Sequence, residues 1–170
     1  MGKKSKSTES SRCLPSSLWE WPQVCEMSAM GKLVYLFLVT GTMSRKTPPG
    51  IACAGIATIA EAVSADREQV VEALGELEDL GVIVRDQATH VIWLPGWMEA
   101  AEPPANPNVL IHRLRSADQI PECALRDRWV QEMLEHAQRR GAAFARAAGK
   151  AIDPALLPQS VADELVGDYA

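Results

Sequence analysis

The stretch GIATIAEAVSADREQVVEALGELEDLGVIVRD, residues 55–86, decides the fold of this chain. Residues 56–63 are typical of a short helix, and residues 64–66 supply a tight turn. The next helix, residues 66–80, places its apolar side chains on one face, and Ser64 or Asp66 can cap its start. Gly81 suits the left-handed residue that ends a helix. The stretch therefore predicts two helices joined by a tight turn.

The segments on either side complete a known order of elements. Upstream, Ser28 can cap a helix that runs to about Val39, and residues 33–39 (LVYLFLV) are apolar on all sides, which predicts that this helix is central. Residues 50–54 indicate a short strand. Downstream, the β-branched runs at 82–84 and 91–94 flank a polar tip and predict a hairpin. Helix, strand, helix, turn, helix and hairpin is the order of a winged helix-turn-helix domain.

This order predicts a mainly α chain of the α+β class, with a winged helix-turn-helix domain and a C-terminal helical extension. Asn106 and Pro107 favour the start of a helix in the extension, and residues 121–140 form a longer one. We expect residues 1–15 and the chain after Lys150 to pack little. The predicted divisions are a disordered basic tail at 1–18, the domain at 19–100, a proline linker and helical extension at 101–140, and a flexible acidic tail at 141–170.

Composition excludes several classes of protein. The chain has 170 residues, 47% of them apolar and 23% charged, as in globular proteins. The longest apolar run, residues 33–39, is too short to cross a membrane, and no signal-peptide pattern follows the basic N-terminus, so we expect a cytoplasmic protein without membrane partners. The four cysteines and three histidines lack metal-ligand spacing, and no catalytic constellation stands out. We expect no metal, no cofactor and no enzyme activity.

Four runs together resemble the winged-helix domain of phage replication-initiation proteins. They are GKLVYLFLVT at 31–40, the stretch at 55–86, HVIWLPGWM at 90–98 and PPANPNVL at 103–110. The resemblance covers about residues 19–120. It implies a DNA-binding phage or prophage protein of DNA replication initiation in a bacterial host cell, with double-stranded DNA as partner and replication proteins as further candidates. The chain departs from the family pattern at Ala52, Cys53, Gly96, Trp97 and Ala105.

Nine side chains are candidates for DNA contact in such a fold. Arg67 is the single basic side chain of the second helix, where a guanidinium reaches guanine or a phosphate, although a solvated arginine beside Asp66 or Glu68 explains it equally well. The others are candidates through their positions in the first helix, turn, wing and loop. The full set is Arg45, Lys46, Thr58, Ser64, Arg67, Gln69, Arg85, Thr89 and His90. Arg113 and Arg115 offer a second small basic patch.

Charge leaves another class of function open. The net charge is −5, and the predicted second helix carries Glu68, Glu72, Glu76, Glu78 and Asp79. Phosphates repel such a face, so only its first turn can approach DNA closely. A transcriptional regulator with the same module is one alternative. A protein-docking module that uses the acidic helix is the other, and the helix at 121–140 could pair with a partner or with a second copy in a homo-oligomer.

Overall fold

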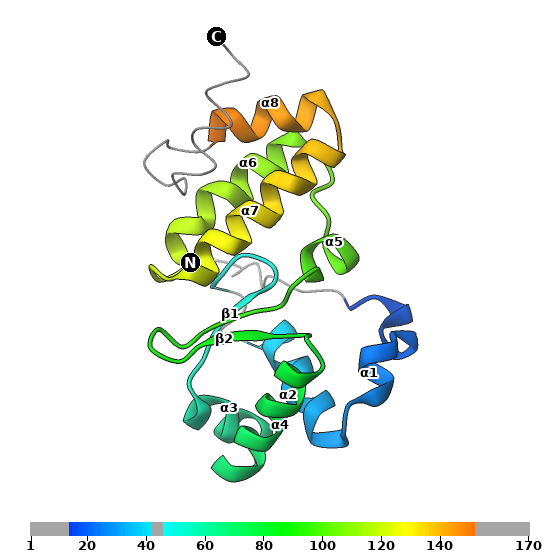
Figure 1. Cartoon of the computed structure of the whole chain (residues 1–170), viewed down its shortest axis with the longest axis vertical. Helices are drawn as coiled ribbons and strands as arrows, with labels where there is room; N and C mark the ends of the chain where they lie inside the picture. The colour runs from blue at the N-terminus through cyan, green and yellow to red at the C-terminus, as the bar shows by residue number, and fades with distance from the viewer. Residues whose placement is uncertain (1–13, 42–45, 152–170) are drawn as a thin grey trace, which may run out of the picture.

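The computed structural model describes residues 14–41 and 46–151, which form a mainly helical α+β structure. A three-stranded antiparallel sheet lies between two groups of helices (Figure 1). The first group and the strands are η1 (Ser16–Glu20), α1 (Pro22–Glu26), α2 (Ala29–Thr40), β1 (Ile51–Cys53), α3 (Ile56–Val63), α4 (Arg67–Asp79), β2 (Val84–Asp86) and β3 (Val91–Trp93). The second group is α5 (Trp97–Ala101), α6 (Pro107–Arg115), η2 (Ser116–Gln119), α7 (Ala124–Arg139) and α8 (Ala142–Ala151).

The predicted order from α2 to β3 is the observed order. The sheet order is β1-β3-β2, so the last strand pairs with both others, and Ile92 lies opposite Ala52 and Arg85. Predicted helix ends are also confirmed. The Ser28 side chain accepts a hydrogen bond from the Gly31 amide at the start of α2, and Gly81 adopts a φ of 68° after α4. These local signals fix where the helices begin and end.

The first strand of the hairpin begins later than the sequence pattern predicts. Residues 82 and 83 leave α4 as a turn, and β2 starts at Val84. The Val82 amide returns to the Leu77 carbonyl, so it closes the end of the helix and is not available for strand pairing. Ile83 is nevertheless fully buried. Its apolar character reflects the core beneath the turn and gives no information on strand pairing.

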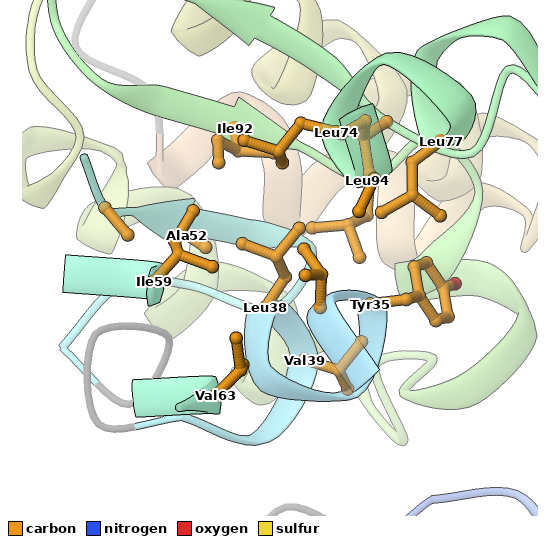
Figure 2. Packing of buried hydrophobic residues seen from close by; sticks show 14 of the residues in the cluster. Tyr35, Leu38, Val39, Ala52, Ile59, Val63, Leu74, Leu77, Ile92 and Leu94 are labelled. Atoms are coloured by element: carbon orange, nitrogen blue, oxygen red, sulfur yellow. The ribbon is translucent and has the colours of Figure 1, made fainter. Parts of the chain in front are cut away.

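Two hydrophobic clusters lie on opposite sides of the sheet. The first packs α2, α3 and α4 around Leu38, Ile59 and Leu74, as Figure 2 shows. The second packs Ile51, Val91 and Met98 against the C-terminal helices. Because the two faces of a strand alternate along the chain, neighbouring residues of β1 and β3 serve different clusters. The C-terminal helices therefore complete the body of the protein.

Hydrogen bonds from α7 attach the extension to the sheet. Trp129, with a fully buried side chain, donates from Nε1 to the Pro49 carbonyl at 2.9 Å. Glu132 accepts hydrogen bonds from Trp93 Nε1 and from the Gly96 amide, each at 3.0 Å, and burial raises the pKa of this carboxyl group. The bonds from the two tryptophans supply partners for polar groups that packing partly removes from water, whereas the bond from the Gly96 amide is exposed.

The structure adds a helix where the sequence predicts the start of a flexible tail. Residues 142–151 form α8, which buries Phe144, Ala147 and Ala148 against α6 and α7. The sequence pattern does not reveal this helix, because alanine occupies both its buried and its exposed face and carries little hydrophobic signal on either. The sequence also assigns residues 16–18 to the disordered tail, but they begin η1, because Leu18 packs into the first cluster. The expectations for residues 1–13, for Arg45 and for the chain beyond residue 151 lie outside the described residues.

Candidate nucleic-acid interface

The junction of α3 and α4 presents the first turn of α4 to solvent. Ser64 adopts a left-handed φ of 55°, which reverses the chain direction between the helices. Asp66, rather than Ser64, caps α4. Its side chain accepts from the Gln69 amide at 2.8 Å, and Gln69 Oε1 accepts from the Asp66 amide at 3.1 Å. This reciprocal pair is a capping box, so the Gln69 side chain is held by the helix end. Ser64 remains exposed.

Arg67 lines a pocket beside the hairpin. The pocket has a volume of about 310 Å³ and lies between the start of α3, the first two turns of α4 and the hairpin. Arg67, Arg85 and His90 all line it, so the fold brings together three of the predicted DNA contacts. Thr58, in the first turn of α3, is exposed, and the backbone of Gly55 begins that helix without a side-chain cap.

Arg85 is held by a carboxylate within the protein. Its guanidinium forms an ion pair with Glu78 of α4, and its side chain is 15% exposed. The hydrogen bond from Arg85 lowers the pKa of Glu78. Arg85 Nε is buried without a hydrogen-bond partner among the described residues. Because Glu78 neutralises this guanidinium, Arg85 attracts a phosphate less strongly than a solvated wing arginine would.

The hairpin tip is short and internally bonded. Asp86 Oδ1 accepts from the amides of Ala88 and Thr89, at 2.9 Å and 3.1 Å. Within the described chain, Thr89 Oγ1 is buried without a hydrogen-bond partner. His90 has a φ of 57° and is exposed. His90 is therefore the member of the wing set that is presented to solvent.

The remaining predicted contacts lie apart from this pocket. Lys46 is exposed at the end of the α2–β1 connection, whereas Arg45 lies outside the described residues. In the extension, Arg113 donates to the carbonyl of Glu102, and Arg115 is exposed. The second basic patch thus contains one arginine with a structural hydrogen bond and one that is solvated.

Two of the acids on α4 are structural. Glu76 accepts from the Ser28 amide at 2.5 Å and from the Ser28 hydroxyl at 2.6 Å, which joins α4 to the start of α2. Glu78 faces β2 through its pair with Arg85. The two carboxylates therefore point to different elements, as their spacing predicts. Glu68 and Glu72 remain exposed on α4.

Charge is distributed unevenly between the two halves of the described chain. Residues 14–41 and 46–101 carry four basic and eleven acidic side chains, and residues 102–151 carry eight basic and six acidic. The part of the described chain before residue 102, which contains α4, is therefore strongly acidic, and the extension is weakly basic. The charge of the described residues around α4 does not attract DNA at long range, so a DNA contact there depends on short-range geometry.

Sequence reasoning missed the role of Glu76 and an aromatic pocket formed by Trp21, Tyr35 and Trp97. The residue types were visible, but neither pairing is local in sequence. Among the described residues, no group of His, Cys, Asp or Glu could hold a metal ion, and no helix is long and apolar enough to cross a membrane. Comparisons with protein-family models, curated proteins and solved structures found no match to this chain.

Proposed function

We propose that this chain is a winged-helix DNA-binding protein of phage or prophage type that acts in replication initiation. The observation that carries the proposal is the arrangement of α3 and α4 beside the β2–β3 hairpin, with the first turn of α4 open to solvent. A major groove admits a helix in this way, and a hairpin then lies near the backbone. The role in replication rests on the sequence resemblance alone.

In this proposal the contact is narrow. Arg67 enters the groove from the exposed first turn of α4, and Thr58 and His90 approach phosphates on either side. Lys46 adds a phosphate contact from the loop. Because Gln69 serves the helix cap and Arg85 is paired with Glu78, both have a smaller part than Arg67. The double-stranded DNA is thus held by few charges, which predicts a weak dependence of affinity on salt.

A band-shift series on two unrelated duplexes tests the proposal. Arg67→Ala should cost about 1–3 kcal/mol on the preferred duplex and reduce the discrimination between the two. Lys46→Ala should weaken both alike and lower the salt slope by about one. Arg128→Ala is the matched control, because Arg128 is also exposed but lies on α7 in the extension. The proposal is wrong if Arg67→Ala and Arg128→Ala bind both duplexes as the unmodified chain does.

The second candidate is a protein-docking module, and the acidic body around α4 favours it. Glu68 and Glu72 face solvent, and eleven acids outnumber four basic side chains in residues 14–41 and 46–101. The variant Glu72→Lys separates the two functions. It should tighten non-specific DNA binding if α4 meets DNA, because a repulsion is removed. If α4 is a docking face, the same variant should lose the protein partner and leave DNA affinity unchanged.

A further inference from the structure

A second pocket lies at the other end of α4, away from the proposed DNA contact. It has a volume of about 280 Å³ and is formed where α1, the end of α4 and the turn before α5 meet. Its lining combines three aromatic rings with backbone at two glycines. The lining residues that matter here are Trp21, Tyr35, Gly81, Gly96 and Trp97.

The aromatic rings form a corner around this space. Trp21 and Trp97 have centroids 5.9 Å apart with their planes at 63°, and Tyr35 and Trp97 have centroids 6.0 Å apart at 76°. In such edge-on pairs the edge of one ring covers part of a face of the other. Trp97 and Tyr35 are 2% and 4% exposed, so half-buried Trp21 offers the accessible ring surface. The face of an aromatic ring is electron-rich and attracts a cation. The rings thus favour a positively charged or planar guest.

The carbonyl end of α4 meets the same pocket. Gly81 and Val82, which follow α4, line it, and their amides are already bonded to the carbonyls of Glu78 and Leu77. The C-terminal end of a helix carries a partial negative charge that stabilises cations within the last turn. This second feature is independent of the rings, and it selects for the same sign of charge.

Tyr35 adds a buried hydrogen-bonding group. The residue is 4% exposed. Figure 2 shows the hydroxyl directed away from the core residues Leu38 and Val39. Burial raises the pKa of Tyr35 to about 12, so the phenol stays neutral and its oxygen can accept an N–H bond.

The surroundings exclude an anionic guest. Among the described residues that line the pocket there is no Lys, Arg or His. Two carboxylates bond to its walls from outside: Glu132 accepts from the Gly96 amide at 3.0 Å, and Glu102 accepts from Trp97 Nε1 at 3.4 Å. The excess of acidic side chains in residues 14–41 and 46–101 extends this negative potential to longer range. A basic molecule is therefore attracted to the pocket, and an acidic one is repelled.

We propose that this pocket receives an arginine side chain from a basic segment of a partner protein. A guanidinium matches all the features at once, because it is planar, permanently charged and carries five N–H donors. Its flat face can lie against the half-buried ring of Trp21 while an N–H reaches the Tyr35 oxygen. The site is separate from the first turn of α4, so it adds a protein contact that DNA binding does not require.

Indole N–H resonances of the full chain measure this binding directly. The probe is the peptide acetyl-Gly-Arg-Gly-amide, and the comparison peptide contains citrulline, which is neutral but has nearly the same shape. The arginine peptide should shift the Trp21 and Trp97 signals saturably, while exposed Trp19 stays unchanged. We expect the citrulline peptide to bind at least about fivefold more weakly, because it lacks the charge that the ring faces attract.

Two variants keep the test independent of folding. Trp21→Leu changes a half-buried wall and should weaken the arginine peptide about five- to tenfold, and Tyr35→Phe should weaken it about threefold or more. Trp19→Leu, at a residue 58% exposed outside the pocket, is the matched control and should bind normally. Equal binding of the citrulline peptide, or no saturable shift below about 50 mM of the arginine peptide, overturns the proposal. DNA band shifts with Trp21→Leu should be unchanged, so this proposal and the proposed function fail separately.

Discussion

Replacing Gly31 with alanine should destabilise this protein, although alanine is the better helix former. Gly31 lies in the first turn of α2, and a Cβ built there falls 2.5 Å from Glu76 Oε2 and 3.2 Å from the Ser28 hydroxyl. The carboxylate has to move, and with it both hydrogen bonds from Ser28. The helix gains up to about 1 kcal/mol from alanine. The loss of two partly solvated bonds to a charged acceptor costs about 2 kcal/mol.

The net expectation is a loss of about 1 kcal/mol in the free energy of unfolding, measured by urea denaturation with an unchanged m value. Gly75→Ala in α4 is the matched control, because nothing lies within 4 Å of the added Cβ, and it should stabilise. In a Glu76→Ala background, Gly31→Ala should also become stabilising, which gives a coupling of about 2 kcal/mol. The reasoning fails if Gly31→Ala stabilises the unmodified chain as much as Gly75→Ala does.

Three further outcomes follow from the buried contacts. Glu78→Gln should destabilise more than Arg85→Met, because it leaves a guanidinium that is 15% exposed without its charge partner; urea denaturation of both variants measures the difference. Trp129→Phe should cost about 2 kcal/mol by the same measurement, because it opens space in the core and leaves the Pro49 carbonyl without its donor. Burial lowers the pKa of His136 from its ordinary 6.5, so the folded state disfavours protonation. Stability should therefore fall as the pH drops below about 6.5 toward the folded pKa, and His136→Phe should flatten that part of a melting-temperature profile; an unchanged slope contradicts the assignment.

The sequence pattern predicts those parts of the fold that depend on neighbouring residues. The capping box of Asp66 and Gln69, the cap at Ser28 and the left-handed Gly81 are local signals, and the structure contains all three. The start of β2 could not be predicted in the same way. Val82 is β-branched and apolar, but its amide is needed to close α4, and only the geometry of the helix end shows that requirement.

The candidate site is predicted less completely, because charge pairing is not local. Arg85 looks like a free wing cation in the sequence, and its partner Glu78 lies seven residues earlier, on a different element. Ser28 and Glu76 are 48 residues apart, so no spacing rule joins them. The sequence therefore identifies Arg67 and His90 as exposed candidates, but it does not identify which of the other charges are already neutralised within the fold.

The position of the sheet between two clusters has a consequence for how this chain can be divided. Residues 14–41 and 46–101 contain the helices η1 to α5 and all three strands, yet the sheet would expose Ile51 and Val91 if the later helices were removed. A fragment that ends after α5 would expose a continuous apolar surface on the sheet and would self-associate. If this part of the chain were transferred to another protein, other residues would have to cover the sheet face that contains Ile51 and Val91. The smallest part of this chain that can be transferred intact is therefore the sheet together with the helices on both of its faces.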